Sequence, residues 1–204
     1  MIGEIKSMRD KLNQAKGKRK LLQNQLEALI QVKESNEQYY NDCLKAREIA
    51  QEVATHTQVH IEFHISNLVT MALASVFPDP YDFRLQFVQR RNKTEADLIF
   101  SKGDNETDDI LNSGGGGVSD VASMALRIAL WSIKKTRSTF ILDEPFKFLH
   151  NPVYQEKASE MIKEISKRLG IQIIMVSDQE NIINAADKVV DIYNVDGESR
   201  ISNE

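Results

Sequence analysis

The stretch Asn112–Leu149, NSGGGGVSDVASMALRIALWSIKKTRSTFILDEPFKFL, decides the fold that the sequence predicts. It opens on four consecutive glycines, Gly114–Gly117, and continues as an apolar stripe with helical spacing. The run Thr139–Leu142 then predicts a buried strand with Asp143 and Glu144 at its carboxyl end. A glycine-rich loop, a helix N-terminus and a strand that ends in carboxylates together indicate a site for nucleotide phosphates.

The segments after this stretch predict an α/β fold with a largely parallel sheet, because strands and helices alternate along them. Apolar spacing predicts an amphipathic helix that ends at Gly170. The remaining predicted elements are a strand at Ile171–Val176, a short helix at Asn181–Ala186, a strand at Lys188–Val195, and a turn at Asp196-Gly197 into a last short strand.

The segment before the glycine run predicts a small antiparallel hairpin. Phe83, Leu85 and Phe87 alternate with polar residues, and Glu95–Phe100 is typical of the returning strand. The acidic stretch Lys102–Asp109 is predicted to be a polar loop that separates the hairpin from the glycine run.

Residues 1–75 predict one long helix, because they contain no proline and only two glycines. The three- and four-residue steps of a coiled-coil seam are followed by Ile5, Met8, Leu12, Ala15, Leu22, Leu26 and Leu29. The same frame includes Arg19, Lys33, Asn36, Tyr40, Cys43, Arg47 and Ala50, so the pattern weakens after about four heptads. A helix of this kind cannot bury its stripe alone, and we expect a partner helix from another chain or from a missing half.

The composition is that of an ordinary soluble protein, with 41% hydrophobic residues and a net charge of −4. Its single cysteine, Cys43, excludes an internal disulfide and fits a reducing cytosol. No apolar run approaches the roughly 20 residues of a membrane span. We therefore expect a cytoplasmic protein that does not enter a membrane.

Two local patterns in the long helix each allow two interpretations. The basic patch Lys16–Lys20 could contact a DNA backbone, but a solvated helix face explains it more simply. His56, His60 and His64 would share one helix face and could bind a metal, but ordinary helix packing is the favoured interpretation.

The carboxylates after the central strand have a chemical reason to be there. Asp143 is predicted to hold magnesium, directly or through water, and Glu144 to polarise the water that attacks a γ-phosphate. The glycines Gly114, Gly115, Gly116 and Gly117 would let backbone N–H groups converge on an anion at the start of the following helix.

Residues 112–195 resemble the C-terminal half of an ABC-type ATPase head of the SMC and SbcC kind. FILDEP at 140–145 matches the family's Walker B strand, and VASMALRIAL at 121–130 is similar to its signature helix. Val176-Ser177-Asp178 falls where the switch motif would lie. The resemblance implies ATP and magnesium as cofactors, and it divides the chain into a coiled-coil helix at 1–75 and a half-head at 76–204.

Three positions depart from the family pattern. Ungapped alignment of the helix places Gly115–Val118 on the signature loop, whereas a shift by two residues recovers Ser113-Gly114-Gly115, and the two registers stay open. His150 takes the position of the D-loop aspartate, and Ser177 takes that of the switch histidine. These departures cast doubt on rapid hydrolysis.

The phosphate loop itself, G-x-x-x-x-G-K-[ST], does not occur in the sequence. The resemblance therefore implies a separate N-terminal half-head that carries Walker A, a second ATPase head, DNA, and a nuclease gated by ATP, as in SbcC-type repair or recombination enzymes. One alternative is a non-catalytic half-head that binds and regulates such an ATPase. Another is an SMC-like DNA-organising protein without a nuclease.

Overall fold

A computed structural model describes residues 2–91, 93–195 and 197–201 of the chain. In chain order its elements are α1 (Ile2–Val76), β1 (Asp82–Arg90), β2 (Lys93–Lys102), β3 (Asn105–Thr107), α2 (Ile110–Ser113), α3 (Gly116–Ile133), β4 (Thr139–Asp143), α4 (Pro152–Leu169), β5 (Gln172–Val176), α5 (Glu180–Ile183), β6 (Ile192–Val195) and β7 (Glu198–Ile201).

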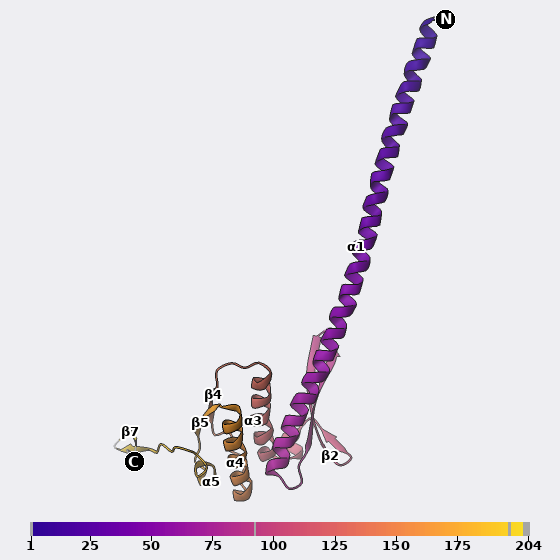
Figure 1. The fold of residues 1–204 in the computed structure, drawn as a ribbon. Helices are drawn as coiled ribbons and strands as arrows, with labels where there is room; N and C mark the ends of the chain where they lie inside the picture. Colours follow the sequence, from indigo (N-terminus) through magenta and orange to yellow (C-terminus); the bar gives the residue numbers. More distant parts are fainter. Residues whose placement is uncertain (1, 92, 196, 202–204) are drawn as a thin grey trace. The chain divides into compact units, whose positions relative to one another are not determined.

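The predicted long N-terminal helix is confirmed, since α1 runs without interruption to Val76 (Figure 1). Contacts divide the chain into two compact units, Met1–Thr57 and Gln58–Glu204, so the boundary falls within α1. The division of the chain at residue 75 into a coiled-coil segment and a half-head stays a prediction.

By length and composition alone, α1 contains a window apolar enough to cross a membrane, with a mean hydropathy of 1.2. A single helix of this kind is weak evidence for a membrane span, because helices of proteins outside membranes pass the same test of length and composition. The last turns of α1 supply Ile65, Val69 and Leu73 to the core, which explains their apolar character without a membrane.

Three polar side chains of α1 bind the outer edge of β1 in the second unit. Leu85 N donates to Ser66 Oγ at 2.9 Å, and Phe83 N donates to Thr70 Oγ1 at 2.9 Å. Phe87 N donates in the same way to Glu62 Oε1. The spacings match, because four helical residues advance about 6 Å and two strand residues advance about 6.8 Å.

These bonds protect an edge that would otherwise be open. The antiparallel sheet has the order β1-β2-β3, so β1 lies at its edge and its outward N–H groups have no strand partner there. The predicted hairpin is confirmed, with Phe83 opposite Phe100 and Leu85 opposite Leu98. The polar loop predicted at Lys102–Asp109 is wrong in part, because β3 pairs Thr107 with Phe100 and extends the sheet.

One hydrophobic core joins the end of α1 to the helices that follow. Its fully buried members include Val69 and Leu73 of α1, and Val121 and Ala129 of α3. Helix α4 contributes Ala158 and ends as the sequence predicts, with Gly170 in the left-handed conformation at φ 63°. The aromatic ring of Phe77 packs edge-on against Tyr154.

The sheet is less parallel than the sequence predicts. Among the described residues, only β4 and β5 pair in parallel, with Asp143 opposite Val176. The strand expected at Lys188–Val195 begins at Ile192 and pairs antiparallel with β7, the predicted last short strand. Closing a short hairpin costs little loop entropy, which favours this local pairing over a return to β5. Asp196, the first residue of the predicted turn, lies outside the described residues.

The edge bonds lead to a test of stability. Ser66→Ala removes the acceptor for the partly buried Leu85 N–H, and we expect it to lower the free energy of unfolding by about 1–3 kcal/mol. Urea denaturation measures this change. Ser35→Ala, on an exposed position of the same helix, is the control and should change stability by less than about 0.5 kcal/mol. Equal effects of the two substitutions would show that the edge bond contributes nothing.

Candidate functional site

The carboxyl ends of β4 and β5 bring the predicted chemical groups to one edge. Asp143 ends β4 opposite Val176, the last residue of β5, and Ser177 follows directly. Glu144 N donates to Val176 O at 2.9 Å, which ties the two strand ends together. Asp143 is exposed and Glu144 is half-buried, so solvent reaches both carboxylates. Their roles in holding magnesium and activating water stay predictions.

Glu144 has a strained backbone, with φ at 40° in the left-handed region. Residues other than glycine adopt this backbone region at a cost of order 1–2 kcal/mol. The surrounding structure must therefore hold Glu144 there. This backbone conformation changes the direction of the chain immediately after Asp143. Glu144 Oε2 also forms an ion pair with Lys147 Nζ at 3.2 Å, which places a cation beside the predicted base.

The four glycines differ in the hydrogen bonds that their amides make, while their contact with an anion stays a prediction. The amides of Gly114 and Gly115 both donate to Ile110 O, at 2.8 and 3.1 Å. Helix α3 begins at Gly116, so the amides of Gly116 and Gly117 have no acceptor within the helix. These two amides, with the positive end of the helix, are the part of the run suited to an anion.

Glycine is required at these positions for two physical reasons. Gly115 has φ 84° and ψ 167°, a region that is essentially restricted to glycine. At Gly116 a Cβ atom would lie 2.5 Å from Phe148 Cβ, and at Gly117 it would lie 2.9 Å from Leu149 Cδ1. The start of α3 therefore packs directly on the segment that follows β4.

Ser113, the serine of the shifted signature register, ends α2 rather than lying at the start of α3. Its hydroxyl lies 3.0 Å from Thr107 Oγ1, and its carbonyl accepts from Tyr81 Oη at 3.2 Å. The ungapped register instead places Gly115, Gly116 and Gly117 at the N-terminus of α3. The local geometry thus favours the ungapped register for contact with an anion, although nucleotide binding by any of these residues stays a prediction.

Asp120 of α3 fixes the segment after β4, and sequence analysis did not single it out. Phe148 N donates to Asp120 Oδ2 at 2.8 Å. Burial raises the pKa of Asp120, and the Phe148 N–H and the nearby His150 partly oppose this rise. His150, at the predicted D-loop position, is itself exposed. The carboxylate thus connects α3 to the segment after β4.

Amide side chains connect the segments after β4 and β5, and they too carry no signal in the sequence. Gln179 Nε2 donates to Phe146 O at 3.0 Å, and Gln179 N donates to Ser177 Oγ at 3.2 Å. The buried Gln155 of α4 donates to Leu149 O at 2.7 Å. These hydrogen bonds join the segment after β5 to the segment after β4.

One face of the parallel strand pair is uncovered among the described residues. Ile141 is 79% exposed and Val176 is 61% exposed, whereas Leu142 is 4% exposed on the opposite, core face. Alternating burial of this kind leaves an apolar face that soluble proteins normally cover. The covered face packs on the core, and the bare face lies beside the Asp143 edge.

Among the described residues, no group of three or more His, Cys, Asp and Glu side chains is placed to hold a metal ion. His64 instead lies 2.9 Å from Ser132 Oγ through Nε2. His64 is thus held by a hydrogen bond at the exposed surface of the helix.

Solved structures with the same fold are heads of SMC proteins, although no protein-family model and no curated protein sequence matches the chain. The chain is 19% identical to a chain studied for ATP-driven dimerization and DNA-stimulated activation of SMC ATPases, with a TM-score of 0.57, and the match covers 74% of this chain and 87% of that one.

Two further structures give the same result. An Smc head bound to the C-winged helix domain of ScpA is 20% identical, with a TM-score of 0.56, over 68% of this chain and 41% of that chain. An Smc head with a coiled coil and joint from Pyrococcus yayanosii is 19% identical, with a TM-score of 0.56, over 68% of this chain and 26% of that chain. The chain has the fold of part of an SMC head and spans less than half of these two structures.

Because the glycine run packs closely on the segment after β4, one methyl group added there should destabilise the fold. Gly116→Ala places a Cβ atom against Phe148 Cβ, and we expect a loss of about 1–3 kcal/mol in the free energy of unfolding. Gly17→Ala is the control, because nothing lies within 4 Å of its added Cβ atom. It should instead increase helix content, measured by far-UV circular dichroism, since alanine favours a helix by roughly 1 kcal/mol over glycine.

The raised pKa of Asp120 predicts a pH-dependent effect of Asp120→Asn. Ionisation of a group whose folded pKa is raised destabilises the fold, so the wild type loses stability as pH rises from 3.8 through the folded value. Asparagine cannot ionise, so its stability relative to the wild type should increase over this range and level off at neutral pH. Urea denaturation across pH tests this. Asp120→Ala, which also removes the acceptor for Phe148 N, should be about 1 kcal/mol less stable than Asp120→Asn throughout.

Proposed function

We propose that this chain is the C-terminal half of an SMC-like ATPase head, which hydrolyses ATP together with an N-terminal half that carries Walker A. The observation that supports this most strongly is the edge of the parallel pair. There Asp143, the strained Glu144 and Ser177 meet beside an apolar sheet face that is uncovered in the described residues.

Each residue has a role in this proposal. Asp143 would bind magnesium, a hard cation that prefers oxygen ligands, through a carboxylate that is already exposed. Glu144 would orient and polarise the attacking water, after its ion pair with Lys147 opens. Ser177 would donate a hydrogen bond to phosphate, without the positive charge that a histidine could add.

The glycine loop would serve a different nucleotide. In the proposed dimer of heads, the amides of Gly116 and Gly117 at the start of α3 would contact the γ-phosphate held by the opposing head. The hydrogen bond of Asp120 and the packing of Gly116 on Phe148 would then couple phosphate binding to the position of the segment after β4. ATP with magnesium would in this way hold two heads together.

The strand pair β4–β5 lacks further strands and a covering helix, and this supports the proposal of a second half-head. A two-stranded parallel sheet with one bare apolar face is marginal by itself, and further strands and a covering helix would stabilise it. Walker A follows a strand and opens a helix, so the half that supplies the phosphate loop would supply both elements. Ile141 and Ile174 would become buried in that assembly.

We place the assembled head in DNA repair or recombination in the cytoplasm, where ATP-driven closure of two heads would gate a partner nuclease on DNA. This part of the proposal rests on the resemblance of residues 112–195 to SbcC-type heads. A DNA-organising role without a nuclease is the alternative, and copurification of nuclease activity with the assembled heads distinguishes the two.

A non-catalytic regulatory half-head is the second candidate function. Lys147 Nζ lies 3.2 Å from Glu144 Oε2, and His150 stands at the D-loop aspartate position. Both features would slow hydrolysis, so the chain could occupy the place of a catalytic half and block it. Recovery of this chain bound to an ATPase that already carries its own C-terminal half would support this candidate.

The catalytic proposal predicts the effect of Glu144→Gln in the pair reconstituted from both half-heads. Loss of a general base lowers rates by about 10²–10⁴-fold, so phosphate release should fall by that factor while ATP still binds. Glu160→Gln, on the exposed surface of α4, is the matched control and should leave the rate unchanged. A reconstituted pair that hydrolyses ATP no faster than its Glu144→Gln form would exclude the enzyme and leave the regulatory candidate.

A further inference from the structure

The strained backbone of Glu144 needs contacts that hold it, because a residue stays in the left-handed region only when the chain around it is fixed. On the amino side, Glu144 N donates to Val176 O at 2.9 Å, which fixes the chain where it leaves β4. On the carboxyl side, Lys147 N donates to Glu144 O at 3.2 Å and closes a turn at 144–147, here called the Glu144 turn. The contacts that fix this turn therefore determine how firmly the Glu144 carboxylate is placed.

The side chain of Gln179 fixes the far end of the Glu144 turn. Its Nε2 donates to Phe146 O at 3.0 Å and to Lys147 O at 3.4 Å. Gln179 is itself fixed, since its backbone N donates to Ser177 Oγ at 3.2 Å. Because Val176 lies only three residues before Gln179, one short segment at the end of β5 holds Glu144 from both sides.

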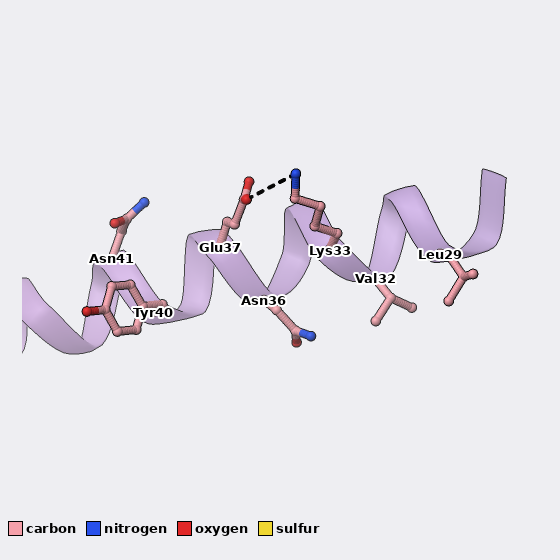
Figure 2. Close-up of a pocket in the computed structure, with 7 residues that line it drawn as sticks. All are labelled: Leu29, Val32, Lys33, Asn36, Glu37, Tyr40 and Asn41. Atoms are coloured by element: carbon pink, nitrogen blue, oxygen red, sulfur yellow. Dashed lines mark ion pairs between the residues drawn. The ribbon is translucent and has the colours of Figure 1, made fainter. Parts of the chain in front are cut away.

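The ion pair of Glu144 with Lys147 is too exposed to hold the turn by itself. The Lys147 side chain is 63% exposed and that of Glu144 is 38% exposed. The pair resembles that of Lys33 with Glu37 on α1, where Nζ and Oε1 lie 3.5 Å apart and both side chains reach solvent (Figure 2). Exposed pairs of this kind contribute little to stability. The amide of Gln179 is therefore the stronger constraint on the turn.

Gln179 is an unusual residue for its place in the chain. It is the N-cap of α5, a position that favours Ser, Thr, Asp and Asn because their side chains accept from the first helical amides. The side chain of Gln179 makes no such bond. Its Oε1 is buried and has no hydrogen-bond partner among the described residues. Both features destabilise a fold, and a functional requirement is a common reason for such departures.

The orientation of the Gln179 amide follows from its surroundings. Two carbonyl oxygens face Nε2, so turning the amide over would place Oε1 against them and lose both bonds. Gln155 differs, because both ends of its amide are paired. Its Nε2 donates to Leu149 O at 2.7 Å, and its Oε1 accepts from Asn181 Nδ2 at 2.8 Å. The role of Gln179 thus lies in its donor group, while its acceptor stays unpaired.

We infer that Gln179 is a positioning residue for Glu144: its side-chain amide holds the Glu144 turn and thereby directs the carboxylate at the attacking water. Gln179 touches neither nucleotide nor water in this role and acts only through Glu144. The inference rests on the proposed function for the role of Glu144 as a base, whereas the hold on the turn belongs to this chain alone. A displacement of about 1 Å at a catalytic group can lower a rate about 100-fold, so the hold matters for hydrolysis.

Gln179→Met tests the hold on the turn in the full chain without nucleotide. Methionine has a similar length and fills the same space, but it can donate to neither carbonyl. In NMR-detected hydrogen exchange, the amides of Lys147 and Leu149 should exchange at least about 10-fold faster than in the wild type, because their protection requires a closed turn. Gln172→Met, at the exposed start of β5, is the matched control and should change these rates less than about 2-fold. Amides within α3 should exchange at wild-type rates in both variants, which shows that the fold is intact.

The second measurement uses the pair reconstituted from both half-heads. Gln179→Met should lower kcat for ATP hydrolysis about 10–100-fold and change KM less than about 2-fold, because it displaces the base without touching ATP. In a Glu144→Gln background, the same substitution should lower the residual rate less than about 2-fold, since no base is left to position. A merely structural role would instead lower the rate by the same factor in both backgrounds.

Two results would overturn the inference. The first is unchanged exchange of the Lys147 and Leu149 amides in Gln179→Met, which would show that other contacts hold the turn. The second is an equal loss of kcat in the wild-type and Glu144→Gln backgrounds, which would show that Gln179 acts on another group. If the reconstituted pair hydrolyses ATP no faster than its Glu144→Gln form, the proposed function fails, and hydrogen exchange in the chain alone still decides whether Gln179 holds the turn.

Discussion

The second unit depends on the hydrogen bonds that backbone N–H groups at the outer edge of β1 donate to side chains of α1. Glu62, Ser66 and Thr70 follow one another at four-residue steps and meet alternate amides of the strand. They satisfy an edge that would otherwise be open to other strands. The same helical turns direct Ile65 and Leu73 into the core, so the hydrogen bonds and the apolar packing fix one another.

That core supports the part of the proposed nucleotide site that this chain contains. It holds β4 and β5 on one face and delivers Asp143 and the strained Glu144 at their carboxyl ends, while the other face stays apolar and exposed. In the proposed enzyme, the strained backbone of Glu144 and its ion pair with Lys147 would hold this carboxylate back from reaction. Both suit a carboxylate that becomes productive only when another segment completes the sheet.

The glycine run shows that a sequence motif can locate an unusual backbone segment without revealing what each of its residues contacts. Gly114–Gly117 marks a special backbone in the sequence, and the structure places it at the start of α3. The sequence could not show that Gly116 faces Phe148, or that Ile110 O occupies two of the amides, because these contacts join segments through tertiary packing. Asp120 and Gln179 were missed for the same reason, since single polar residues have no periodicity or motif.

The sequence by itself determined the long helix, the hairpin, the strand that ends in Asp143-Glu144 and the helix that ends at Gly170. These features depend on local propensity and on spacing, which residues close in the chain encode. The tertiary structure alone decided that β3 extends the hairpin of β1 and β2 and that one face of β4 and β5 stays bare. Strand partners and sheet faces depend on which segments meet in space, and no local pattern specifies that.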